Sequence, residues 1–174
     1  YLFHSRYQEH VLADIARYEK EHLESERSRV RMEVQAQVDR IDARIDQVEA
    51  QMKRNIKERV EEAHSIAEHL YEQHKDARSP EEIQELIRTT LRPIRFHSGR
   101  GYYFIITTQG VAVVNGAAPH LEGRNIWDLQ DSKGKYFVRE FVEVGSANGG
   151  GYSKYFWPKP DKEEGTYPKY SFLK

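Results

Sequence analysis

The first half of this sequence contains no residue that would break a helix: neither glycine nor proline occurs before Pro80. Because these two residues are the ones that most disfavour a helix interior, residues 6–78 contain nothing that would end a helix, and one continuous helix can form there. At 1.5 Å per residue such a helix would be about 100 Å long, far more than a domain of this size can cover. Part of it must project or pair with another helix, most simply that of a second copy.

The predicted helix has one apolar face. Its apolar residues recur in steps of three and four with a mean close to 3.6 residues, the period of a helix with one buried stripe. They are Val34, Val38, Ile41, Ile45, Val48, Met52, Ile56, Val60, Ala63, Ala67 and Leu70. Residues 19–33 have few apolar side chains, so the helix is solvated there or the chain turns. Outside the stripe, the charged residues fit either a solvated helix or a coiled coil.

The second half has the composition of strands and turns. All 11 glycines lie at or after Gly99, and 15 of the 20 aromatic residues lie after position 95. Between the halves, Ser79, Pro80 and Glu82 predict the start of a second helix, because they combine an N-cap, a favoured first residue and a capping box. Pro93 predicts the end of that helix.

Residues 101–107 and 111–114 are rich in β-branched and aromatic residues, and the turn Gln109-Gly110 between them predicts a β-hairpin. Further elements follow: a short helix around Phe137, Phe141 and Val144, and the strands 152–157 and 169–174. The sequence therefore predicts an α+β fold, in which a long N-terminal helix packs on an antiparallel sheet of four or five strands. We divide the chain into a helical region, 1–78, and a sheet domain, 79–174.

The overall composition excludes several classes of function. With 27 basic and 28 acidic residues, the chain has no charge excess that would favour binding to nucleic acid. It has no cysteine, which excludes disulfides, thiolate metal sites and a thiol nucleophile. No apolar run reaches the roughly 20 residues of a membrane span. Since the chain starts at Tyr1 and ends in a strand without a turn, we expect it to continue on both sides, with membrane anchors in the full-length protein.

The sequence contains no pattern typical of catalysis, of a metal site or of a cofactor. His64, His69 and His74 are five residues apart, so they spread around a helix and are predicted to face solvent. Asp131, in Asp-Ser-Lys-Gly, is predicted to cap a turn by bonding the backbone two residues on. There is no phosphate loop and no nucleophile elbow. We therefore expect no enzyme activity, no metal and no cofactor.

Polar-tipped aromatic residues and cations in the second half predict a small-molecule pocket, because tyrosine hydroxyls, an indole N–H and an ammonium are all donors suited to a carboxylate. These residues are Arg100, Tyr102, Tyr103, Tyr152, Tyr155, Trp157, Lys159 and Lys169. For each residue taken alone, a role in the hydrophobic core is the alternative.

Several motifs in order resemble a single Cache sensor domain. They are Leu91-Arg92-Pro93-Ile94-Arg95-Phe96, Gly99-Arg100-Gly101-Tyr102-Tyr103-Phe104-Ile105, His120-Leu121-Glu122-Gly123-Arg124-Asn125, Leu129-Gln130-Asp131-Ser132-Lys133-Gly134, Tyr155-Phe156-Trp157-Pro158-Lys159-Pro160 and the closing residues 169–174. Together with the helix 56–70, the resemblance covers roughly residues 50–174.

The resemblance implies a PAS-like Cache fold in residues 79–174 and a place outside the cell membrane, in the periplasm, as the sensor of a histidine kinase, chemoreceptor or diguanylate cyclase. It also implies a homodimer and a small-molecule ligand, often a short organic acid. The ligand-binding residues that we predict are Tyr102, Phe104, Asn115, Tyr155, Trp157 and Lys169.

This chain departs from the family at two places. Asn115-Gly116 stands where members often have a His-Pro-like pair, so an amide is expected to replace a histidine contact with the ligand. The strands that such domains have in their C-terminal part are expected beyond Lys174, which would leave the sheet truncated here. An alternative function is a dimerisation module without a ligand, which senses through a partner protein.

Overall fold

The computed structural model of the protein describes residues 2–162 and 164–174, with side chains from residue 10 onward. By its contacts the chain divides into two compact units, Tyr1–Gln51 and Met52–Lys174. Helix α1 spans Leu2–His74, so of the two alternatives that the sequence left open for residues 19–33 the structure has the helix and not the turn. None of the described helices combines the length and the apolar composition needed to cross a membrane.

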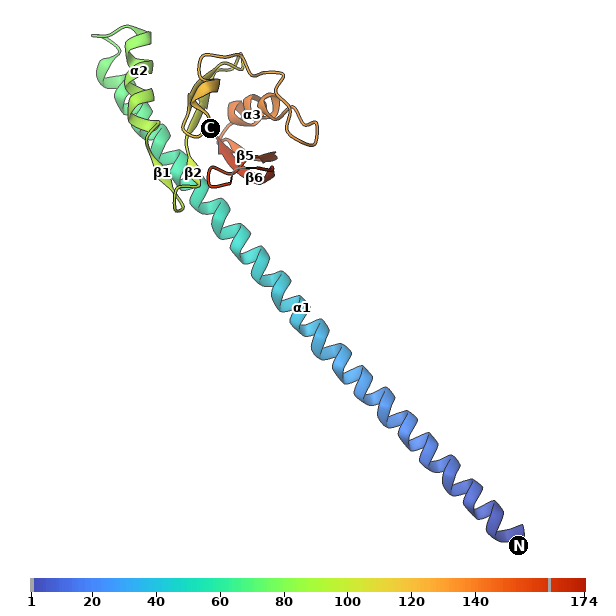
Figure 1. Cartoon of the computed structure of the whole chain (residues 1–174). Helices are drawn as coiled ribbons and strands as arrows, with labels where there is room; N and C mark the ends of the chain where they lie inside the picture. The colour runs from blue at the N-terminus through green and yellow to red at the C-terminus, as the bar shows by residue number, and fades with distance from the viewer. Residues whose placement is uncertain (1, 163) are drawn as a thin grey trace. The chain divides into compact units, whose positions relative to one another are not determined.

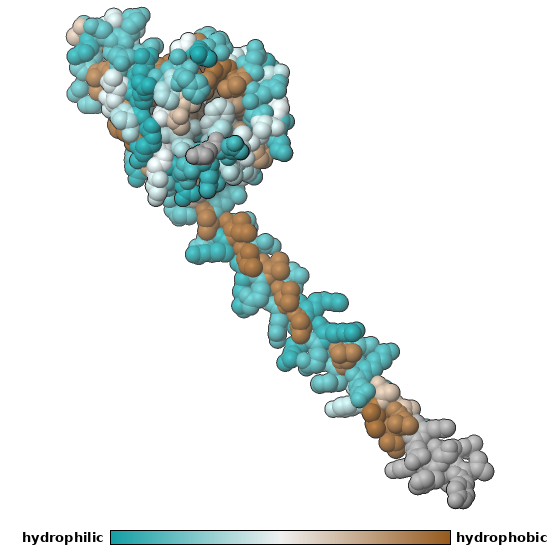
Figure 2. Space-filling model, in the orientation of Figure 1, coloured by the Kyte–Doolittle hydropathy of each residue, from teal (hydrophilic) through white to brown (hydrophobic). Residues whose placement is uncertain are grey.

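The first unit consists of α1 alone. No side chain of residues 10–51 is buried, and residues 19–33 are helical, so the chain does not turn there. Large apolar side chains on this part of the helix are exposed, and Figure 2 shows several of them following one another along the helix. They are Val11, Leu12, Ile15, Tyr18, Leu23, Val30, Met32, Val34, Val38, Ile41, Ile45 and Val48, which we call the N-terminal apolar stripe.

The second unit begins with the last part of α1 and continues with helix α2, Pro80–Leu91 (Figure 1). The predicted capping box is present: Oγ of Ser79 accepts from N of Glu82, and the Glu82 carboxylate accepts from N of Ser79. Leu91 of α2 packs with Ala63 of α1 and with Tyr103, and this small core joins both helices to the strands.

Six strands follow among the described residues, paired as three antiparallel ladders. Strand β1, Arg95–Phe96, pairs with β2, Gly101–Tyr102; β3, Phe104–Ile106, pairs with β4, Ala112–Asn115; and β5, Gly151–Trp157, pairs with β6, Tyr167–Leu173. The α+β class is confirmed, but the described strands form three two-stranded ladders rather than one sheet of four or five strands.

The predicted hairpin is confirmed, with Gly110 at its turn in the left-handed region, at φ 82°. Its first strand is shorter than predicted, because the stretch 101–107 divides at Tyr103. The hydroxyl of Tyr103 donates to the carbonyl oxygen of Arg59 in α1, 3.0 Å away. Tyr102 therefore pairs with β1, while Phe104 pairs with β4.

A 3₁₀ turn, Pro119–Leu121, and helix α3, Phe137–Ser146, complete the unit. Phe137, Val138 and Phe141 of α3 form the larger core with Tyr155 of β5 and with Ala112 of β4. The predicted turn at Asp131 is also present, because the Asp131 carboxylate accepts from N of Lys133 at 2.8 Å.

Candidate ligand-binding site

Lys169 of β6 is at the centre of a group of aromatic side chains. Its Nζ donates a hydrogen bond to the hydroxyl of Tyr102 at 2.6 Å. The same Nζ lies 3.9 Å from the centre of the Tyr102 ring, 5.9 Å from that of Phe104 and 5.7 Å from that of Tyr155. An ammonium against ring faces is stabilised by the ring quadrupoles, but it has lost most of its water.

The alternation of side chains along the strands explains why these residues meet. Tyr155 and Lys169 are direct partners in the β5–β6 ladder, so their side chains share one face, and Trp157, two residues further, lies on that face too. Tyr102 and Phe104 are also two residues apart, and the residue between them, Tyr103, points to α1.

The desolvated position of Lys169 lowers the pKa of its ammonium group to about 7. Burial raises the pKa of Tyr102 to about 12, although a hydrogen bond with Trp157 partly offsets the rise. Burial also raises the pKa of Tyr155, whose hydroxyl shares a 3.1 Å hydrogen bond with Ser171. Both tyrosines are therefore neutral donors near pH 7.

A cleft of about 790 Å³ opens beside this group. Its walls come from residues 52–67 of α1, from β2 and β3, and from β6, and most of the side chains that line it are apolar or aromatic. Tyr102, Phe104, Trp157 and Lys169 are four of them. Among the described residues, the ionisable groups of the lining are cationic, histidine or tyrosine; none is a carboxylate.

A second, smaller hollow of about 20 Å³ lies against Phe137 and Phe141 of α3. Asn115 and Tyr155 line it, together with Tyr102, Phe104 and Trp157, which also line the cleft. This volume is about that of one bound water. All six predicted residues therefore line at least one of the two hollows, and Tyr102, Phe104 and Trp157 line both.

Asn115 holds its own loop as well as lining the small hollow. Its Oδ1 accepts from N of Ala117 at 3.2 Å and from N of Ala118 at 2.8 Å, which is an Asx turn. These two donors fix the orientation of the amide, because only the oxygen can accept them. The Nδ2 amino group of Asn115 makes no hydrogen bond to the described residues.

The other polar aromatic and cationic residues divide into two groups. Arg100 and Lys159 line the cleft. The hydroxyls of Tyr103 and Tyr152 instead donate to backbone carbonyls of α1, those of Arg59 and Lys53, so these two tyrosines are structural links.

The wall formed by α1 was not among the predicted site residues. Met52, Ile56, Val60, Ala63 and Ala67 line the cleft, and their stripe was visible in the sequence, but its period cannot distinguish a cavity wall from a core.

His64, also in this wall, is half-buried and not solvent-facing as predicted. Its Nδ1 lies 3.2 Å from the carboxylate of Glu68. His69 is exposed, and no described group of three acidic or histidine side chains is placed to hold a metal.

Known structures share this architecture. A methyl-accepting chemotaxis protein from Vibrio parahaemolyticus is 24% identical, with a TM-score of 0.62 over 75% of this chain and 82% of that one. A periplasmic sensor domain of a chemotaxis protein is 28% identical, with a TM-score of 0.65 over 71% of this chain and 85% of that one. A structure described as showing carboxylic acid recognition by a Cache chemosensory domain is 20% identical, with a TM-score of 0.61 over 74% and 84%.

No curated protein sequence matches the chain significantly. The Cache domain family, however, matches residues 7–174, which is nearly the whole chain. The motifs in the sequence, the fold and the family match agree, and this chain belongs to the Cache domain family.

Proposed function

We propose that this chain is the periplasmic ligand-sensing domain of a membrane-anchored bacterial receptor, and that it binds a small carboxylate beside Lys169. The observation that carries the proposal is the lining of the two hollows: a desolvated ammonium, hydroxyl donors and an indole stand among apolar side chains, with no carboxylate among the described lining residues. An anion in such a place gains a charge-assisted hydrogen bond and compensates the lost hydration of Lys169.

The proposed ligand-binding residues are Tyr102, Phe104, Asn115, Tyr155, Trp157 and Lys169. Lys169 would pair with the carboxylate, the tyrosines and Trp157 would donate hydrogen bonds, and Phe104 would contact the apolar part of the ligand. The carboxylic acid recognition named for a structural relative supports this class of ligand.

In this proposal, residues 79–174 form the ligand-binding domain and residues 1–78 the signalling and dimerisation helix. The end of α1 contributes a wall of the cleft, so a ligand that prefers one packing of the strands against α1 would shift the population of that packing. The exposed apolar stripe on residues 11–48 supports pairing with a second copy.

A thermal-shift and calorimetric comparison of wild type and Lys169→Met tests the carboxylate site, with acetate, propionate, pyruvate and succinate as probes. We expect at least one probe to raise the melting temperature of the wild type and to have no effect on Lys169→Met. The variant itself should be at least as stable as wild type, because a methionine needs no hydration. Lys162→Met, on an exposed loop, is the matched control and should respond like wild type.

If none of the carboxylates binds wild type, the carboxylate proposal is wrong, and the interaction module without a ligand becomes the better explanation. If a carboxylate binds wild type and Lys169→Met equally, the ligand is carboxylate but the site lies elsewhere.

A further inference from the structure

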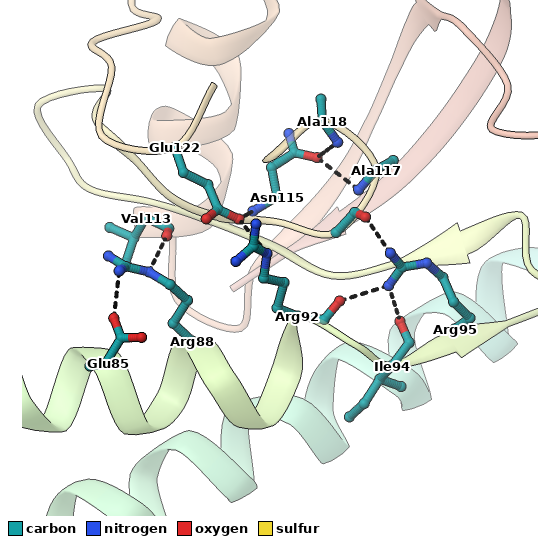
Figure 3. A network of polar contacts seen from close by, with 11 residues as sticks. Glu85, Arg88, Arg92, Ile94, Arg95, Val113, Asn115, Ala117, Ala118 and Glu122 are labelled. Atoms are coloured by element: carbon teal, nitrogen blue, oxygen red, sulfur yellow. Dashed lines mark hydrogen bonds and ion pairs between the residues drawn. The ribbon is translucent and has the colours of Figure 1, made fainter. Parts of the chain in front are cut away.

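The end of β4 is held to helix α2 by a set of arginine contacts (Figure 3). Arg88 of α2 donates from Nε to the carbonyl oxygen of Val113 at 3.1 Å. Arg95, in β1, donates to the carbonyl oxygen of Gly116 and also to that of Arg92. Two guanidinium groups thus bind the backbone on either side of Asn115, the residue that lines the small hollow.

Glu122 completes this arrangement from the other side. One of its carboxylate oxygens accepts from the backbone N of Asn115 at 2.8 Å and lies 3.4 Å from Nε of Arg92. The Glu122 side chain is only 12% exposed, whereas that of Arg92 is 45% exposed. A carboxylate with so little water depends on its two partners, and removal of either partner should weaken its hold on the other.

Close packing leaves little freedom at this point. A Cβ atom at Gly116 would lie 2.9 Å from Nη1 of Arg95 and 3.1 Å from Cβ of Tyr102. The turn after β4 therefore lies directly against both the arginine and a residue of the proposed site. The Asx turn of Asn115 binds the amides of Ala117 and Ala118, so it ties this loop to the wall of the small hollow.

The other side of α2 contacts α1. Leu91 packs with Ala63, in the part of α1 that lines the cleft, and with Tyr103. Helix α2 therefore connects the polar contacts at β4 to the helix that would convey the signal.

We propose that Glu122 and Arg92 are positioning residues of the ligand site: their ion pair holds Asn115 and its loop in place and couples this wall of the site to α2 and α1. The proposal rests on the proposed function for its link to a ligand. The mechanical part, in which Arg92 controls the loop through Glu122, holds without any ligand and can be tested separately.

Amide hydrogen exchange without ligand tests the mechanical part. Glu122→Gln and Arg92→Gln should each speed the exchange of the Asn115, Ala117 and Ala118 amides about tenfold, while the double variant should be no faster than the faster single one. Arg92→Lys, which keeps the charge, should restore most of the protection. Arg124→Gln makes the same chemical change two residues from Glu122, on an exposed side chain, and should leave these amides unchanged.

The inference is overturned if Arg92→Gln leaves exchange at the three amides within about twofold of wild type, or if Arg124→Gln speeds it equally. The link to the ligand is tested with propionate: Arg92→Gln should weaken its binding about tenfold, and the protection that propionate confers on residues 80–91 should disappear. If wild type does not bind propionate, the proposed ligand is at fault and the exchange of the free protein still decides the inference. If propionate protects residues 80–91 of Arg92→Gln as it does in wild type, the coupling through Arg92 is wrong.

Discussion

Among the described residues, the ammonium of Lys169 has one hydrogen-bond acceptor, the hydroxyl of Tyr102, and the rings of Tyr102, Phe104 and Tyr155 lie beside it at the wall of the cleft. Such a group is strained electrostatically, because the rings replace only part of the hydration that it would have in water. This lost hydration favours an anion over a neutral ligand, because an anion bound here would replace part of the hydration that the ammonium lost on folding.

Carboxylate binding should therefore depend on pH near neutrality. Burial lowers the pKa of Lys169 from its ordinary 10.5 to about 7, so an increasing fraction of the ammonium is neutral above pH 7. A bound carboxylate favours the ammonium and raises its pKa again, so binding takes up protons and the affinity should fall up to about tenfold per pH unit above 7. Calorimetry between pH 6 and 9, in buffers of different ionisation enthalpy, measures both effects.

The same shift has a consequence for folding. Between pH 7 and 10.5 the unfolded state holds more protons at Lys169 than the folded state, so this residue makes the free energy of unfolding rise with pH in that window. Lys169→Arg, which stays charged, should lack both pH dependences. A wild-type affinity that is flat from pH 6 to 9 would show that Lys169 does not pair with the ligand.

Asp131 ties the loop before α3 to strand β5. Its carboxylate accepts from the backbone N of Lys133, of Lys135 and of Phe156, at 2.8, 3.0 and 2.9 Å. Asp131→Asn would place the N–H of the new amide against one of these backbone N–H groups, so that one hydrogen bond is lost. We expect this variant to lower the free energy of unfolding by about 1–3 kcal/mol in urea titrations. Asp128→Asn, at an exposed side chain, should change it by less than about 0.5 kcal/mol.

The pH dependence of Asp131 has the opposite sign to that of Lys169. Burial by itself raises the Asp131 pKa, but the three backbone hydrogen bonds outweigh it, so the pKa lies below 3.8. Its stabilisation is therefore complete above the unfolded pKa and is lost as the pH falls through the folded one. The stability difference between wild type and Asp131→Asn should shrink towards pH 2; a constant difference would contradict this account.

At the scale of elements, helix α2 shows how local chemistry sets a boundary. Its capping box satisfies two backbone donors at the first turn, so Ser79→Ala should lower the free energy of unfolding by about 1 kcal/mol. Chemical denaturation measures the loss, and Ser79→Asp, which can still cap, should retain most of the stability. Equal stability of Ser79→Ala and wild type would mean that packing alone fixes the start of α2.

The elements that could be predicted from sequence are those with local signals. The helix α1 followed from the absence of glycine and proline, α2 from its cap, and the hairpin from Gln109-Gly110. The division of the stretch 101–107 had no such signal, because it depends on a hydrogen bond from Tyr103 to α1, 44 residues away in the chain. The separation of the strands into three ladders is equally a matter of tertiary contacts.

The candidate site could be predicted in its residue types more than in its architecture. Tyrosine, tryptophan and lysine in the second half indicated a pocket because they are donors suited to a carboxylate, and the structure brings Tyr102 and Tyr155 together beside Lys169. The role of Asn115 in an Asx turn, and the hold of Glu122 on its backbone, depend on contacts that no periodicity encodes. The wall formed by α1 was missed for the same reason.

At the scale of the whole molecule, the N-terminal apolar stripe is the feature that the monomer leaves without an explanation. Twelve large apolar side chains on residues 11–48 are exposed, which is more than a solvated helix needs. In a coiled coil the apolar side chains that share one face, Val34, Val38, Ile41, Ile45 and Val48, would pack against the same residues of a second helix.

Dimerisation can be tested by placing charge in this stripe. The double variant Ile41→Asp/Ile45→Asp should be monomeric at concentrations where wild type is dimeric in sedimentation experiments, because the charges would be buried unpaired in the helix pair. Ala43→Asp adds a charge on the opposite side of the helix and should leave the dimer intact. Wild type that sediments as a monomer at high concentration would rule out dimerisation through this chain.

The contacts that hold the end of β4 also bear on how a Cache domain of this kind can change over evolutionary time. Arg88, Arg95 and Glu122 bind backbone atoms of residues 113–116 and not their side chains. Apart from Asn115, whose side chain forms the Asx turn, side chains in this wall can therefore be exchanged while these contacts to the strand are kept, provided that position 116 stays glycine. Under the proposed function, ligand preference can then change by mutation while the contacts that connect this wall to α2 and α1 are kept.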